Sequence, residues 1–363
     1  MVLKEYPYYL KVTVILFGLI LFIHILGALG DVLVPLAFAL LVAILLNPLC
    51  NKLNSYKIPR PVAIIIALVI AILGVAAILY FLSAQIISFS SSFPELQKKF
   101  GDITQQVENW VHTNFGIDAE RQVAFIKSTL SNSKAFFGRT LSTVLGTLGL
   151  IFLIPVYTFM ILYYKNLILN FLYEVFSEKN SKQVAEILKE TKSAVQSYIV
   201  GLLVEMVIVA IMNSVALLLL GVKYAILLGV IGAILNMLPY IGGLIAIALP
   251  ILIATVTKDG YSTQFGILIA YLVIQFIDNN IVFPRVVSFK VQINALISIV
   301  IVLLGNELWG IAGMFLSVPF VAVIKIIFDR IDELKPWGKL LGDTIPTRPL
   351  GRNFLRPKAK AAA

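Results

Sequence analysis

Residues 224–257 read YAILLGVIGAILNMLPYIGGLIAIALPILIATVT, a run of 34 residues without a charged side chain. At about 1.5 Å per residue, an unbroken helix of this length would extend roughly 51 Å, whereas the hydrocarbon core of a bilayer is about 30 Å thick. The middle of the run contains Asn236, Pro239, Gly242 and Gly243, and proline and paired glycines break helices. The two arms, of about 15 residues each, favour a re-entrant helical hairpin with these four residues at its tip.

The composition places this run in a membrane protein. Of the 363 residues, 60% are hydrophobic and only 13% are charged, which excludes an ordinary soluble domain and a disordered chain. A transmembrane β-barrel is disfavoured, because its strands alternate and rarely give long uncharged runs. The sequence predicts an all-α polytopic membrane protein with about six full transmembrane helices, two re-entrant helical hairpins and a small helical extracytoplasmic domain.

The predicted organisation follows from the placement of the charged and amphipathic stretches. The second hairpin is expected where Asn306 and Glu307 interrupt another apolar run. In chain order we expect transmembrane helices 1–3 in residues 1–82, an extracytoplasmic amphipathic helical domain in 83–140, transmembrane helix 4 in 141–164, a cytoplasmic amphipathic helix in 165–198, a transport core in 199–330 with broken-helix hairpins at 224–257 and 291–328, and a basic flexible cytoplasmic tail in 331–363. The order span, hairpin, span, hairpin in the core is the layout of an inverted repeat, which is typical of secondary transporters.

The basic residues predict the orientation. The net charge of +10 would suggest nucleic acid as the partner of a soluble protein, but in a membrane protein Lys and Arg collect in cytoplasmic loops. Basic residues near the ends of the spans therefore place both termini in the cytoplasm; those used are Lys4, Lys11, Lys52, Lys57, Arg60 and Lys165. If residues 224–257 crossed the membrane, Arg285 and Lys290 would lie outside, whereas a hairpin keeps them inside. The charge rule favours the hairpin.

Several functional classes lack their sequence signatures. Cys50 is the only cysteine, so the chain has no internal disulfide and no thiolate metal site. The sequence contains no His-Glu-x-x-His motif, no Gly-x-Ser-x-Gly motif and no Walker loop. We therefore predict that the protein is not an enzyme and has no cofactor, with Na⁺ or H⁺ as coupling ions. The first apolar stretch is long enough to span and lacks a cleavage site, so it is expected to be a helix rather than a signal peptide.

Polar residues inside the apolar segments are the candidates for a transport pathway, because they are costly in a membrane. Gln275, Asp278 and Asn279 are spaced i, i+3 and i+4, so they share one helix face. Together with the first hairpin tip, the predicted pathway residues are Glu205, Asn213, Asn236, Pro239, Gly242, Gly243, Gln275, Asp278, Asn279, Asn280, Pro284, Arg285, Asn306 and Glu307.

Structural interpretations of the same residues remain open at this point. Asp278 and its two following asparagines can be the interfacial end of a span, with Asn as a C-cap. Glu205 lies near the predicted inner interface, where its side chain can reach water. Asn306 and Glu307 can form a plain polar loop.

Three motifs resemble those of a known family. Residues 229–250 contain NMLPYIGG, residues 278–285 read DNNIVFPR, and residues 308–319 read LWGIAGMFLSVP. In this order they resemble the AI-2E (autoinducer-2 exporter) transporter family, and the resemblance covers nearly the whole chain. It implies a multi-pass transporter of the bacterial cytoplasmic (inner) membrane, linked to export of autoinducer-2 or to exchange of Na⁺ or Li⁺ for H⁺. It also implies a homo-oligomer, with a pentamer as one candidate assembly.

The combined prediction is a secondary transporter that exports a small polar solute, similar to autoinducer-2, or exchanges a monovalent cation for H⁺. Glu205 or Asp278 is expected to be the titratable site, because a carboxylate that trades a proton for a cation explains antiport. The expected partners are the lipid bilayer, the solute or cation and further copies of the chain, without nucleic acid. A passive oligomeric pore and a non-transporting membrane scaffold or sensor are the alternatives.

Overall fold

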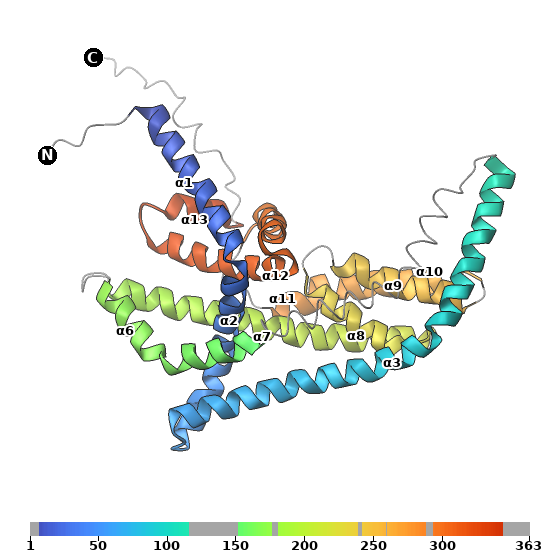
Figure 1. The fold of residues 1–363 in the computed structure, drawn as a ribbon, viewed down its shortest axis with the longest axis horizontal. Helices are drawn as coiled ribbons and strands as arrows, with labels where there is room; N and C mark the ends of the chain where they lie inside the picture. Colours follow the sequence, from blue (N-terminus) through green and yellow to red (C-terminus); the bar gives the residue numbers. More distant parts are fainter. Residues whose placement is uncertain are drawn as a thin grey trace, which may run out of the picture.

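The computed structural model describes residues 7–115, 152–175, 181–238, 242–258, 260–287 and 293–343, and these ranges contain helices and no strand (Figure 1). The elements are α1 (Tyr8–Ala28), α2 (Gly30–Ser55), α3 (Arg60–Phe115), the helix Phe152–Tyr163, α6 (Lys165–Val175), α7 (Ser181–Leu219), α8 (Ala225–Asn236), α9 (Gly242–Thr257), α10 (Ser262–Ile277), the π-helix η2 (Asp278–Val282), α11 (Phe283–Val286), α12 (Ala295–Arg330) and α13 (Lys335–Leu341).

The lengths and composition of these helices confirm the predicted all-α polytopic membrane protein. In the described residues, six helices are long and apolar enough to cross a membrane: Tyr8–Ala28, Gly30–Ser55, Arg60–Ile87, Lys182–Leu219, Ser262–Val286 and Ala295–Arg330. The predicted fourth span, 141–164, lies partly outside the described ranges. Its described part, Phe152–Tyr163, bends by 62° into α6, and this bent pair would make a seventh span.

Two helices continue through boundaries that the sequence predicted. Helix α3 has no break near residue 82, where the third span was expected to give way to a separate domain. Helix α7 likewise runs through residue 198, the predicted end of an amphipathic helix. The reason is that a helix satisfies its own backbone groups in water and in lipid alike, so a change of polarity does not end it. Residues 116–140 of the predicted outer domain lie outside the described ranges.

The first hairpin consists of two short helices, α8 and α9, that pack against each other. A methyl group on Gly242 would overlap the carbonyl of Leu235, and one on Gly232 would lie 3.4 Å from the Cβ of Ala246. Glycine at these positions therefore lets the two backbones approach closely. Both arms of the hairpin predicted at 224–257 are present, although residues 239–241, which include Pro239, lie outside the described ranges.

The second hairpin turns at a different place from the one predicted. Within α12 the non-helical residues are Trp309 and Gly310, and Gly310 has a φ of +60°, which glycine adopts without a steric penalty. Beyond this kink the chain folds back, because a methyl group on Gly305 would lie 2.5 Å from the carbonyl oxygen of Gly313. The break expected at Asn306–Glu307 is therefore wrong, since asparagine and glutamate continue the helix and the glycine that follows them ends it.

The beginning of the predicted flexible tail is ordered and attached to the second hairpin. Helix α13 lies within residues 331–363, which the sequence predicted to be flexible. The Nδ2 of Asn294 donates to the carbonyls of Leu340 at 2.7 Å and Gly342 at 3.1 Å. The backbone N–H of Asn294 donates to Leu341 as well. The sequence did not indicate this contact, because the partners lie 46 to 48 residues apart. Residues 344–363 lie outside the described ranges.

Asn294 also caps α12, and this double role gives a first prediction. Its Oδ1 accepts from the backbone N–H of Ile297 at 2.8 Å, so Asn294→Ala loses the cap and both side-chain hydrogen bonds to the end of α13. We expect a loss of about 1 kcal/mol from the cap alone. Hydrogen–deuterium exchange should become faster in α13. Asn294→Asp keeps the cap acceptor and loses only the donors, so it should accelerate exchange in α13 while leaving the start of α12 protected; equal exchange in both variants and wild type would contradict this.

Candidate functional site

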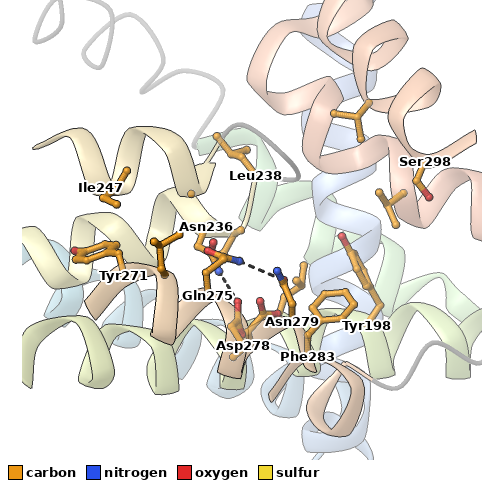
Figure 2. A pocket seen from close by; sticks show the side chains of 17 residues that line it. Tyr198, Asn236, Leu238, Ile247, Tyr271, Gln275, Asp278, Asn279, Phe283 and Ser298 are labelled. Carbon is orange, nitrogen blue, oxygen red and sulfur yellow. Dashed lines mark hydrogen bonds between the residues drawn. The ribbon is translucent and has the colours of Figure 1, made fainter. Parts of the chain in front are cut away.

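A cavity of about 610 Å³ opens between α7, the tip of the first hairpin, α10 with η2, and α12 (Figure 2). We call it the acidic cavity, because Glu205 of α7 and Asp278 of η2 both line it. The other lining residues are Tyr198, Leu202, Asn236, Met237, Leu238, Gly243, Ile247, Tyr271, Leu272, Gln275, Asn279, Phe283, Ser298, Val302 and Val318. The cavity therefore brings together residues of every element from α7 to α12.

Close packing around the cavity fixes the positions of these elements. A methyl group on Gly201 would lie 2.7 Å from the Cα of Val287, so glycine allows the segment after α11 to lie directly on α7. The core beside this contact is formed by α7, α12 and Val287; its buried residues are Val195, Tyr198, Ile199, Leu202, Val287, Val302, Met314 and Val318. This apolar core supports one wall of the acidic cavity.

Two helices present matching polar faces to the cavity. On α7 the lining residues Tyr198, Leu202 and Glu205 are spaced i, i+4 and i+7, and on α10 and η2 Tyr271, Gln275 and Asp278 repeat that spacing. Residues at this spacing lie on one side of a helix. Each face therefore carries a tyrosine at one end and a carboxyl group at the other.

Both carboxyl groups are buried and incompletely paired. Asp278 is 2% exposed, and its Oδ2 accepts a hydrogen bond from the Nδ2 of Asn236 at 3.0 Å, while its Oδ1 has no partner among the described residues. Glu205 is 6% exposed, and its Oε2 likewise has no partner there. Burying a polar oxygen without a partner is costly, and burying an unpaired charge costs more. These oxygens are therefore available to a proton or to a bound ligand.

The tip of the first hairpin and α10 each add one amide oxygen to the site. A methyl group on Gly243 would lie 3.2 Å from the Oε1 of Gln275 and 3.7 Å from the Oδ1 of Asn236, so both oxygens face the same small space. The amide nitrogens are occupied elsewhere, since Asn236 donates to Asp278 and Gln275 donates to the Oδ1 of Asn279 at 3.2 Å (Figure 2). The carboxyl and amide oxygens give the site several hydrogen-bond acceptors, which suit a cation or a solute with several donors.

The π-helix η2 directs the side chains at the end of α10. Its backbone closes with a hydrogen bond from the N–H of Phe283 to the carbonyl of Asp278, five residues earlier. Such π-turns occur mostly as single turns within α-helices and often at functional sites. Asp278 is buried in the cavity wall, whereas Asn280 is exposed and donates to the carbonyl of Phe276 at 2.8 Å.

The structure brings together only part of the predicted pathway. The cavity is lined by six of the predicted residues: Glu205, Asn236, Gly243, Gln275, Asp278 and Asn279. Gly242 lies beside them, in the packing contact between the two arms. Asn213 is buried next to Gly232 between α7 and α8, outside the lining. Five others are exposed and away from the cavity: Asn280, Pro284, Arg285, Asn306 and Glu307.

Three polar lining residues were missed from the sequence. Tyr198 and Tyr271 precede Glu205 and Asp278 by seven residues, two helical turns, and the spacing could have revealed them. The hydroxyl of Tyr271 is buried and has no hydrogen-bond partner among the described residues. Ser298 carried no such signal, because it reaches the cavity from α12, a different part of the chain.

Comparison with known proteins gives consistent matches over most of the chain. The sequence model described as AI-2E family transporter matches residues 10–333. The AI-2 transport protein TqsA of Escherichia coli K12 is 23% identical over 335 residues, which cover 92% of this chain and 96% of TqsA. YhhT of the same strain is 26% identical over 327 residues (90% and 91%), and YrrI of Bacillus subtilis 168 is 24% identical over 305 residues (81% and 85%). The names of YhhT and YrrI assign them to transport only provisionally.

Proposed function

The chain belongs to the AI-2E transporter family, and on this basis we propose that it is a secondary transporter whose solute or ion passes through the acidic cavity. The observation that carries this proposal is the pair Glu205 and Asp278. Two carboxyl groups from different helices line one cavity, each is buried, and each has an oxygen without a partner among the described residues. Ionisable groups inside a membrane protein are functional candidates by default, because their burial is costly.

The acceptor-rich lining defines two classes of cargo. A monovalent cation such as Na⁺ or Li⁺ could bind the carboxylates and the amide oxygens of Asn236 and Gln275, and a proton could replace it on Glu205 or Asp278. A small solute with several hydroxyl groups, similar to autoinducer-2, could donate to the same oxygens. One relative, TqsA, is named as an AI-2 transport protein, which supports the second class.

We extend the proposal to the setting of the protein. The chain is placed in a bacterial inner membrane with both termini in the cytoplasm, as a homo-oligomer. The α8–α9 hairpin and the α12 hairpin are proposed to enter the membrane without crossing it. The order α7, hairpin, α10, hairpin supports this, because transporters with inverted repeats place their binding sites at broken helices. Export is the proposed direction of transport.

A flux assay in proteoliposomes tests the function. We expect proteoliposomes that contain the purified chain to accumulate or release Na⁺, Li⁺ or an autoinducer-2-like solute only when a pH gradient is imposed. Protein-free vesicles are the control. Flux of the same size without a gradient would contradict coupling and indicate a passive pore. Flux of all three no faster than in protein-free vesicles would contradict these cargo classes and favour a scaffold or sensor.

A further inference from the structure

A second polar site lies apart from the acidic cavity, where the end of α2, the start of α3 and the start of α6 meet. Two basic side chains are held there by neutral groups. Arg60 Nη2 donates to the carbonyl of Leu162 at 2.6 Å, and Lys165 Nζ donates to the Oδ1 of Asn47 at 3.0 Å. We call Asn47, Arg60, Lys165 and the nearby Lys192 the basic cluster. Its residues come from α2, α3, α6 and α7.

Apolar packing beneath the basic cluster keeps the two cations together. The buried residues of this core come from α2, α3 and the helix Phe152–Tyr163; they are Ala43, Leu46, Cys50, Ile64, Ala67, Leu68 and Leu162. Thr158 adds a hydrogen bond across the same interface, from its Oγ1 to the carbonyl of Ala39 at 3.3 Å. Arg60 and Lys165 are half-buried, so their positions are set by the fold rather than by free rotation in water.

The charges in the basic cluster have one sign. The charges of Arg60 and Lys192 both act on Lys165 and repel it. In the part of the chain that is described, neither Arg60 nor Lys165 forms an ion pair with a carboxylate. Helix α3 begins at Arg60 and α6 begins at Lys165, and the N-terminal end of a helix carries partial positive charge. A cluster of this kind attracts an anion from outside it.

Asn47 provides an independent indication of a ligand. The residue is 5% exposed, and while its Oδ1 accepts from Lys165, its Nδ2 is buried without a hydrogen-bond partner in the described structure. Buried amide nitrogens nearly always donate a hydrogen bond. No described protein group accepts one from this nitrogen, so an acceptor is missing. An anion beside Lys165, whose Nζ contacts the same amide group, would supply that acceptor.

We propose that the basic cluster binds the phosphate group of an anionic phospholipid. Phosphate combines the charge that the cations require with oxygen acceptors for Arg60, Lys165 and Asn47 Nδ2. A lipid is favoured over free phosphate by the location. Arg60 starts a helix that is long and apolar enough to span, and Lys165 joins two apolar helices, so both mark a level where apolar surface ends. Anionic headgroups lie at that level in a membrane, and basic pockets between helices bind them.

Reconstitution of the full chain in lipid nanodiscs tests this site. We expect phosphatidylglycerol, added to phosphatidylcholine nanodiscs, to raise the melting temperature and to remain bound in native mass spectra. A third preparation contains phosphatidylcholine with inorganic phosphate, which is expected to give no rise. An equal rise with inorganic phosphate would overturn the lipid as the ligand, and no rise with either would overturn the site.

Matched variants separate specific binding from general attraction. Arg60→Gln and Lys165→Gln should each weaken phosphatidylglycerol binding about tenfold, which corresponds to the loss of one charge-assisted hydrogen bond. Lys52→Gln removes an exposed lysine from the end of α2 and should leave binding unchanged. An equal loss in Lys52→Gln would overturn the proposal.

One further variant keeps the test valid if the glutamine variants fail to fold. Asn47→Asp places a carboxylate against Lys165, where it supplies the missing negative charge from within the chain. This variant should be more stable than wild type in neutral nanodiscs and should bind phosphatidylglycerol about tenfold more weakly. Unchanged lipid affinity in Asn47→Asp would also overturn the proposal.

Discussion

Replacing Asp278 by asparagine is expected to reduce gradient-coupled flux in proteoliposomes to the level of protein-free vesicles. Asparagine has nearly the same shape, and its Oδ1 can still accept the hydrogen bond from Asn236 Nδ2, so the fold should be retained. What the variant loses is the negative charge and the ability to bind a proton on the buried Oδ1. Because we propose that proton exchange at this carboxylate couples transport, its removal should abolish coupled flux completely rather than reduce it in part.

Two matched variants make this result specific. Asp31→Asn removes an exposed carboxylate from the first turn of α2, away from the acidic cavity, and should leave flux unchanged. Glu205→Gln tests the second buried carboxylate in the same way. If Asp278→Asn retains gradient-dependent exchange and Glu205→Gln loses it, then Glu205 is the titratable site. Retention in both variants would remove the carboxyl pair from the mechanism.

Replacing Gly313 by alanine is expected to cause a large loss of stability. The added methyl group would overlap the carbonyl of Gly305 and lie 3.1 Å from the Cβ of Trp309, so the two arms of the α12 hairpin must move apart. Overpacking in a closely packed core costs about 1–3 kcal/mol, and here the neighbouring atom is backbone, which cannot rotate away. We expect the free energy of unfolding and the melting temperature in detergent to fall accordingly.

Gly74→Ala is the matched control. Gly74 lies inside α3, and a methyl group there would meet no atom within 4 Å. Alanine in a helix interior is favoured over glycine by about 0.5–1 kcal/mol, so this variant should be as stable as wild type or slightly more so. Equal melting temperatures for Gly313→Ala and Gly74→Ala would contradict the close packing of the second hairpin.

The sequence predicted the elements of this fold better than their ends. The uncharged run around Asn236 would form a helix longer than a bilayer is thick, and it has two glycines in its middle. This comparison of lengths correctly indicated two short helices. The turn of the second hairpin was misplaced because polarity was used to locate it. Backbone conformation decides the turn instead, and Gly310 was the residue able to adopt the required positive φ.

The candidate site was predictable where the informative spacing lies within one helix. Gln275, Asp278 and Asn279 were assigned to one face from their spacing, and all three line the acidic cavity. Contacts between distant segments left no such pattern. The approach of Asn236 to Asp278 depends on how α8 packs, and the attachment of α13 to Asn294 depends on a helix that its basic composition did not reveal.

The π-turn at η2 has a consequence for insertions and deletions. A π-turn is equivalent to an α-helix that has accepted one extra residue while the helices on both sides keep their orientation. Deleting one residue within Asp278–Val282 would therefore leave Ser262–Ile277 and Phe283–Val286 facing the same directions as before. Deleting one residue from the regular part of α10 would turn everything after it by about 100°. The length of this segment is thus adjustable at one place only, and that place contains the aspartate of the cavity.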